Sequence, residues 1–392
     1  MDVTHRLTRH VHYVAGFDPR GWRLIRGALK EAMDLWSIRT GTPITWLPAD
    51  STIPHPNLGI RTDAVDTRFV FLDWDDTVRA YWPKSDGRVA TQAAGFVLRS
   101  LANGTLLALK RHTWPLAVSL SSTALPFAAR ISIPVEMALG AGLGALLAGV
   151  PGMTAGAALG GVAGVWAQRT LQRLATRLQS SWTGRVSLFA EQLAQDTIEG
   201  MDGHVARFRA TLERSLGEAD ETVLVGHSTG GILAPMVAHA LAQHGARLDG
   251  GRFTLLTVGS ISPYVVAHPF PSKAREALRA LGTRTFPWID ISSPRDGAGG
   301  VLVNPADVLG TKGASPLLLN AQFHKTFAPE KVDAAAKAPL DLHFLYFRAT
   351  DQATAGGDLW DWPATLMDTR RVPVRYATRT SQPSPYTKRR RA

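Results

Sequence analysis

Short runs rich in β-branched and apolar residues alternate along the chain with longer segments whose apolar positions recur at helical spacing. The runs that predict strands are residues 10–17, 68–73, 221–226, 252–259, 284–291 and 341–347. The segments that predict helices are 21–38, 186–216, 230–244 and 272–281. Residues 222–225 form an apolar run of the kind found in strands that are buried on both faces. Strands that alternate with helices predict an α/β fold with a mainly parallel sheet flanked by helices.

One long segment departs from this alternation, because residues 137–168 contain no charged side chain. Uncharged apolar stretches of this length are typical of membrane-spanning helices. Pro151 and Gly152 divide the segment, so we expect two helical arms, 131–150 and 153–168, that form an inserted hairpin. Small residues recur four positions apart and would let the two helices approach closely. These pairs are Gly140/Gly144, Gly152/Gly156, Gly156/Gly160 and Gly160/Gly164.

The flanks of the hairpin indicate how it would sit in a membrane. After the second arm, three leucines share one helix face and three arginines share the opposite face, as in a helix that leaves the bilayer at head-group level. They are Leu171, Leu174 and Leu178, and Arg169, Arg173 and Arg177. The segments before residue 87 and after residue 190 must join the same sheet, so both ends of the insertion lie in one compartment. Two crossings fit best, with the basic flanks on the cytosolic side. A re-entrant hairpin and a soluble pair of cap helices over the active site are the alternatives.

The distribution of charge supports this interpretation. The chain has 43 Lys and Arg against 32 Asp and Glu, a net charge of +11, and a sequence pI of about 10.2. Such a pI is typical of nucleic-acid-binding proteins, but residues 87–190 alone carry a net charge of +8 and the last five residues one of +4. The remaining chain is nearly neutral, so we expect a membrane surface and no nucleic acid as the partner. The absence of cysteine excludes disulfides, thiolate zinc sites and cysteine nucleophiles.

The candidate nucleophile lies in the sequence Gly226-His227-Ser228-Thr229-Gly230, which matches the pattern G-x-S-x-G. A strand of the buried type precedes it and an apolar helix follows, which is the setting that this motif requires. Ser228 would lie at the helix N-terminus, where the helix dipole favours a developing anion. The alternative is a glycine-rich turn in which Ser228 only caps the helix.

With this motif in this setting, the chain outside the insertion and the tail resembles the α/β-hydrolases, and among them the lipases. The resemblance implies the chain order nucleophile, acid, histidine. Asp296, on the loop beyond the run at 284–291, is the expected acid, and Asp290, within that run, is the alternative. His324 is the expected base because it lies in a loop-like segment. His343 falls in the middle of a predicted strand, where packing is the simpler explanation.

The oxyanion hole of such an enzyme combines two backbone N–H groups. Thr229 would supply one, and the loop after the first strand would supply the other, with Phe17 as the expected donor. Residues 12–21, together with 71–76, also resemble a little-characterised bacterial group of membrane-associated α/β-hydrolases. The three aspartates within 71–76 receive no role, because strand-end capping explains them as well as substrate contact does. Scattered histidines without a His-Glu-x-x-His motif disfavour a metal site.

These features predict a membrane-anchored serine hydrolase that cleaves a carboxylic ester, with a lipid or another acyl compound as substrate and no cofactor. Residues 131–168 would contact the lipid bilayer of a bacterial inner membrane, with the catalytic part facing the cytoplasm. Residues 1–10 contain no apolar stretch, so we expect no cleavable signal. The alternative is a catalytically inactive membrane scaffold with the same fold. The expected divisions are 1–100 and 181–379 for the two parts of the hydrolase, 101–180 for the apolar insertion and 380–392 for a disordered basic tail.

Overall fold

An eight-stranded sheet lies at the centre of the computed structural model, which describes residues 6–311, 315–352 and 357–387. The strand order is β2-β3-β4-β1-β5-β6-β7-β8. The pairs β2/β3 and β3/β4 are antiparallel, and all other neighbours are parallel. The strands are β1 (Leu7–Val14), β2 (Thr45–Leu47), β3 (Asn57–Arg61), β4 (Val65–Phe71), β5 (Glu221–His227), β6 (Phe253–Val258), β7 (Trp288–Ser292) and β8 (Leu317–Asn320). The prediction of an α/β fold with a mainly parallel sheet flanked by helices is confirmed.

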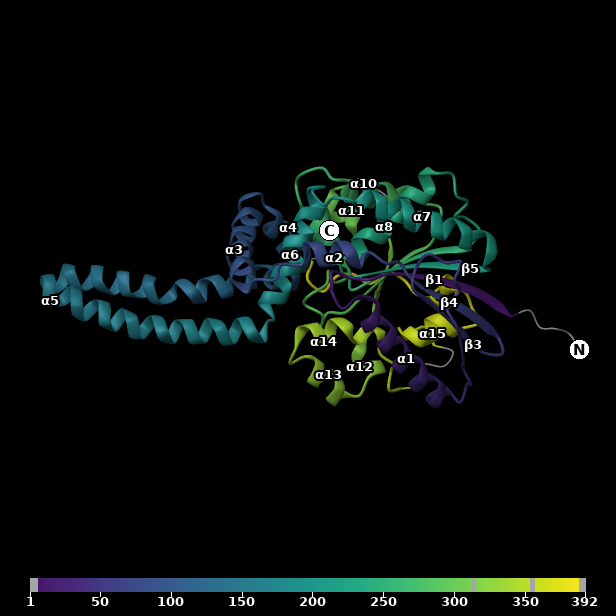
Figure 1. The fold of residues 1–392 in the computed structure, drawn as a ribbon, viewed down its shortest axis with the longest axis horizontal. Helices are drawn as coiled ribbons and strands as arrows, with labels where there is room; N and C mark the ends of the chain where they lie inside the picture. Colours follow the sequence, from purple (N-terminus) through teal and green to yellow (C-terminus); the bar gives the residue numbers. More distant parts are fainter. Residues whose placement is uncertain (1–5, 312–314, 353–356, 388–392) are drawn as a thin grey trace, which may run out of the picture.

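Helices pack into hydrophobic cores on both faces of the sheet (Figure 1). On one face they are α2 (Asp75–Tyr81), α3 (Asp86–Ala102), α4 (Thr105–Ser122), α6 (Ser180–Ala194), α7 (Met201–Glu218), α8 (Gly230–Gln243), α9 (Ser262–Ala267), α10 (Lys273–Ala280) and α11 (Pro305–Leu309). On the other face they are α1 (Gly21–Thr40), α12 (Phe323–Thr326), α13 (Pro329–Ala335), α14 (Pro339–Phe344), α15 (Trp362–Met367) and α16 (Val372–Arg375). Successive strand side chains point to opposite faces, so Leu224 of β5 enters the first core while Val223 and Val225 enter the second.

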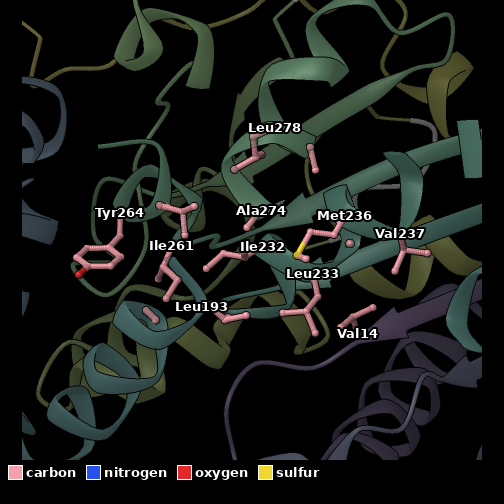
Figure 2. Close-up of a cluster of buried hydrophobic side chains, with 14 of the residues drawn as sticks. Val14, Leu193, Ile232, Leu233, Met236, Val237, Ile261, Tyr264, Ala274 and Leu278 are labelled. Atoms are coloured by element: carbon pink, nitrogen blue, oxygen red, sulfur yellow. The ribbon is translucent and has the colours of Figure 1, made fainter. Parts of the chain in front are cut away.

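The helix α8 lies at the centre of the first core. Its residues Ile232 and Leu233 are fully buried, and Figure 2 shows them among Val14 of β1, Leu193 of α6 and Leu278 of α10. Burial on this scale fixes the axis of α8 relative to β1 and β5. The turn between β5 and α8, which contains the candidate nucleophile, is therefore held by a fully buried strand and by a helix whose first nine residues are buried.

The segment 341–347 was predicted as a strand and is instead helical, formed by α14 and the short 3₁₀ helix η2 (Leu345–Phe347). Pro339 occupies the first turn of α14, a position that its fixed backbone angle favours. Leu342, Leu345 and Tyr346 recur at helical spacing, and all three are buried in the second core. The run 341–347 therefore fits both a strand and a helix, and packing against the second core favours the helix.

The long apolar helix α5 (Leu125–Arg177) extends away from the sheet and folds back on itself as two antiparallel arms (Figure 1). The bend lies at Ala148 and Gly149, whose backbone angles are not helical, rather than at Pro151 and Gly152 as predicted. Pro151 falls in the first turn of the second arm, where its missing N–H costs no hydrogen bond. The proline therefore marks the start of an arm and not the break.

Glycines allow the two arms to touch backbone to backbone, as predicted. A side chain at Gly144 would collide with the carbonyl of Gly152, and one at Gly140 with the carbonyl of Gly156. Within the described part of the chain, α5 is the one helix long and apolar enough to cross a membrane; its most apolar 18-residue window has a mean hydropathy of 1.7. None of that window is buried in the protein.

Two predicted boundaries differ from the structure. The projecting insertion is α5 alone, because α4, which lies within the predicted insertion 101–180, buries Leu109 and Leu116 in the first core. Residues 380–387, predicted to be disordered, lie against the body: the Gln382 amide donates to the Leu318 carbonyl, 2.9 Å away. The rest of the predicted tail, 388–392, lies outside the described residues.

Candidate active site

Ser228 occupies a sharp turn between β5 and α8. Its φ of 57° lies in the left-handed region, which costs energy for any residue with a side chain. The Ser228 amide donates to the carbonyl of Val258, 3.1 Å away, and this bond holds the turn against the neighbouring strand. Gly230 must be glycine because a Cβ there would collide with the carbonyl of Val14. The predicted strand–turn–helix setting of the serine is thus present, with the serine 8% exposed.

Asp296 lies on the loop after β7 and is buried, with 1% of its surface exposed. Its Oδ2 accepts a hydrogen bond from His343 Nδ1 at 2.8 Å and a second one from the Tyr346 hydroxyl at 3.1 Å. Its Oδ1 accepts a third, from the Ala298 amide at 3.0 Å. Three donors from two segments of the chain therefore fix the position of this carboxylate.

His227 packs its ring against that of His343 and contacts the His343 backbone. The Nε2 atom of His227 lies 3.3 Å from the His343 carbonyl oxygen, and the two ring centroids are 4.7 Å apart. Burial, with the nearby His343 as a lesser cause, holds the pKa of His227 well below its usual value. His227 is therefore a neutral packing and hydrogen-bonding residue, and its place in the motif next to Ser228 serves to position α14.

Ser228 and His343 line the same two cavities, both of which are bounded by α6 and α14. The first, of about 30 Å³, is also closed by the loop after β1 and by α1, and the second, of about 50 Å³, by α4 and by Ile261, which precedes α9. Trp182, Val186 and Leu340 line both cavities. The lining is mainly apolar, so the space next to Ser228 suits hydrocarbon groups better than charged ones.

The structure does not bring His324, the base predicted from the sequence, to Asp296: the histidine that hydrogen-bonds this aspartate is His343. His324 is exposed on the four-residue helix α12, whose buried residues are Phe323 and Thr326. In the sequence, His343 falls in a run of strand length, which favours packing over a catalytic role. The proline before the run and the helical spacing of its apolar residues were the available signals that it belongs to a helix.

The alternative acid, Asp290, forms no hydrogen bond or ion pair with His324 or His343, all three of which are among the described residues. It lies within β7, and its Oδ2 accepts a hydrogen bond from the hydroxyl of Thr257 at 2.6 Å. Burial raises the pKa of Asp290 to about 7. Of the two aspartates considered, only Asp296 is placed to orient an imidazole.

The two predicted oxyanion donors, Phe17 and Thr229, are neighbours in the structure. The Phe17 amide donates to the Thr229 hydroxyl at 2.5 Å, so that N–H group is engaged by a side chain and would have to turn from it to reach an oxyanion. The Thr229 amide precedes α8 and belongs to the N–H groups that a helix cannot satisfy from within. The loop that contains Phe17 can approach Ser228 closely because residue 16 is a glycine: a Cβ on Gly16 would lie only 2.8 Å from the Cβ of Ser228.

The three aspartates that follow β4 form local contacts. The Asp73 carboxylate accepts a hydrogen bond from the Asp75 amide at 2.9 Å, at the start of α2. Burial, reinforced by the Asp73 charge, raises the pKa of Asp75 to about 6. Asp76 lies 3.4 Å from His204. Nowhere in the described residues do three or more His, Asp or Glu side chains form a group that could hold a metal ion.

Comparison with known proteins assigns no relative to this chain: no family model, no curated protein and no solved structure matches it. The interpretation of the site therefore depends on its own geometry, which brings together a strained serine, a buried histidine and an aspartate held by three donors.

Proposed function

We propose that the protein is a membrane-anchored serine hydrolase of the α/β-hydrolase type that cleaves a carboxylic ester. Ser228 is the nucleophile, His343 the general base and acid, and Asp296 the residue that orients the imidazole. The observation that carries the proposal is the 2.8 Å hydrogen bond between His343 Nδ1 and Asp296 Oδ2, beside cavities that His343 shares with Ser228. A serine, a histidine and an aspartate in this relation form the recurring arrangement of serine hydrolases.

The hydrogen bond to Asp296 determines the chemistry of the histidine. With its proton on Nδ1 bonded to the carboxylate, His343 presents an unprotonated Nε2 to the cavity. Nε2 takes the proton of the Ser228 hydroxyl while Oγ forms a bond to the ester carbonyl carbon. It then returns that proton to the departing alcohol as the ester C–O bond breaks. A water molecule reverses these steps on the acyl-enzyme, and the acid product leaves.

The apolar lining of the two cavities supports an ester with hydrocarbon groups, and a lipid or another acyl compound is the substrate class that we propose. The residues at the site would also serve thioester or amide hydrolysis, because all three reactions use the same nucleophile and proton transfers. Each cavity is narrow, so α6 and α14 must separate before a long acyl group can bind.

The membrane anchor in this proposal is α5. Residues 131–147 of the first arm extend ~26 Å at the rise of an α-helix, close to the ~30 Å thickness of a hydrocarbon core. The irregular backbone at Ala148 and Gly149 needs water or head groups to satisfy its polar atoms. Two crossings, which bring the bend to the far interface, therefore fit better than a shallow re-entrant loop. The body and the basic flanks would lie on the cytoplasmic side.

A fluorophosphonate probe tests the chemistry, because it labels only activated serines. We expect labelling of the wild type, none of Ser228→Ala, and labelling of His343→Ala slowed by about 10³-fold or more. The matched control is His324→Ala, which should be labelled like the wild type. A wild type that the probe does not label would favour the inactive scaffold. A His324→Ala variant that loses labelling while His343→Ala keeps it would return the role of base to His324.

A further inference from the structure

A groove runs along the second arm of α5. It has a volume of about 610 Å³. Its lining comprises Ile133 of the first arm and Ala158, Gly161, Val162, Val165, Trp166, Arg169, Thr170 and Arg173 of the second. The groove is independent of the cavities at Ser228, with which it shares no residue.

The two ends of this groove differ in chemistry. The end toward the bend is hydrocarbon and open, with Val162 71% exposed and Trp166 72% exposed. The end toward the body is cationic, because Arg169 and Arg173 lie one helical turn apart and are both exposed. Among the described residues, neither arginine forms an ion pair with a carboxylate, and Glu136 is the sole acidic residue in the whole of 87–190.

We propose that this groove binds one phospholipid with an anionic head group. The phosphate lies between Arg169 and Arg173, whose guanidinium groups match phosphate oxygens in charge and geometry. An acyl chain follows the helix past Trp166 and Val162 toward Ala158, a path of ~16 Å at the helical rise per residue. The proposal rests on the insertion of α5 into a bilayer, and it adds a lipid class to that anchor.

The distribution of groups along the arm argues for a lipid rather than a free anion. A free phosphate would use only the two arginines and would leave the apolar length of the groove unoccupied. A tryptophan between the arginines and the apolar length is placed as aromatic residues are at the boundary between head groups and acyl chains. The pattern thus follows the order of groups in one phospholipid molecule: charge, interface, hydrocarbon.

The test uses the full chain reconstituted in vesicles of phosphatidylcholine alone or of phosphatidylcholine with phosphatidylglycerol, followed by native mass spectrometry of the lipid that stays bound. We expect the wild type to retain phosphatidylglycerol over phosphatidylcholine by about tenfold, and Arg169→Gln/Arg173→Gln to lose that preference. The control Arg247→Gln/Arg252→Gln removes the same charge from exposed positions on the loop between α8 and β6 and should retain it.

Four results would overturn the proposal, and they are distinguishable. A wild type that inserts into vesicles but retains both lipids equally contradicts the proposed lipid site without contradicting the membrane anchor. An Arg169→Gln/Arg173→Gln variant that keeps the preference for phosphatidylglycerol has the same meaning. Displacement of the lipid by inorganic phosphate at matched ionic strength assigns the arginines to a free anion. A wild type that inserts into neither kind of vesicle contradicts the membrane anchor of the proposed function, and the lipid site with it.

Discussion

The body and the hairpin of this protein place apolar side chains in opposite ways. In the body, Leu224 and Ile232 are fully buried between sheet and helices, whereas in the hairpin Leu146 is 86% exposed and Leu147 77% exposed. Exposed leucines are unfavourable in water, so the apolar surface of the hairpin carries a free-energy cost there that the body avoids by burying its apolar side chains. The comparison shows two kinds of surface in one chain: the body buries its apolar side chains, whereas α5, which is long and apolar enough to cross a membrane, exposes them.

Glycine serves both regions for the same physical reason and with different results. At the turn after β5, Gly230 lets a helix start beside the backbone of β1, and Ser228 in this turn keeps its left-handed backbone. In α5, Gly144 lets one helix lie against the carbonyl of Gly152. Close backbone approach therefore shapes the turn at Ser228 in the body and lets two helices pack together in the hairpin.

Deletion of the hairpin gives the largest expected separation of the two regions. The arms are close at their base, where the Ser132 hydroxyl lies 3.3 Å from the Gly164 carbonyl, so a short Gly/Ser link can replace 131–168. We expect this variant to move from the membrane fraction to the soluble fraction after ultracentrifugation, while Ser228 remains reactive toward the fluorophosphonate probe. The division into two regions fails if the shortened chain is soluble but unreactive, or if the wild type is itself soluble.

The packing of the two arms is tested by a pair of substitutions within one helical turn. Gly144→Leu places a side chain against the backbone of the second arm, whereas Gly142→Leu points into open space. We expect Gly144→Leu to force the arms apart and to lower the amount of inserted protein by several-fold, with Gly142→Leu close to the wild type. The measurement is the yield of protein in washed membranes. Equal yields for the two variants would show that the arms do not pack as described.

The body should also show a pH response that the hairpin does not share. The folded pKa of Asp290 is about 7 against an ordinary value of 3.8. Between these two pH values the folded state keeps a proton that the unfolded state has released, so the free energy of unfolding falls as the pH rises. Asn at this position can still accept from Thr257 without becoming charged. We expect Asp290→Asn to melt a few degrees above the wild type at pH 8, with the difference reduced at pH 5.

Melting curves of both proteins at the two pH values check this prediction, and the hairpin deletion is the control. Because Asp290 lies in β7, the effect of Asp290→Asn should be the same in the deleted chain. A stability difference that does not change between pH 5 and pH 8 would mean that the buried carboxyl is not the source of the response.

The sequence alone predicts the parts of the fold whose pattern is local. β1, β4, β5, β6 and β7 fall on apolar runs of strand length, and the glycines around Ser228 announce the turn. β2 and β8 are too short to give a pattern, the apolar pattern does not mark β3, and pairing with their neighbours defines all three strands. The partner of Asp296 could not be found in this way, because it lies 47 residues further along the chain and its run fits both a strand and a helix.

The junction between the two regions gives the smallest and most specific prediction. Gln179 joins α5 to α6 with a left-handed backbone, φ 50°, and its side-chain oxygen accepts a hydrogen bond from the Leu340 amide at 2.7 Å. Leu340 begins the helix that carries His343, so Gln179 positions the proposed base from the root of the hairpin. Loss of one hydrogen bond of about 1 kcal/mol should lower the kcat of Gln179→Ala for a soluble ester by about fivefold, with little change in KM.

Gln179→Glu keeps an acceptor oxygen and should restore most of the kcat, whereas Gln243→Ala, at an exposed position of α8, should behave like the wild type. Kinetics of the full chain in detergent and in vesicles add a readout that simple destabilisation would not move. If the hairpin and the site are connected through this residue, the rate difference between detergent and vesicles seen for the wild type should shrink in Gln179→Ala. If Gln179→Ala lowers the rate equally in detergent and in vesicles, Gln179 acts only within the body. The hairpin and the site would then be connected by the chain alone and not through this residue.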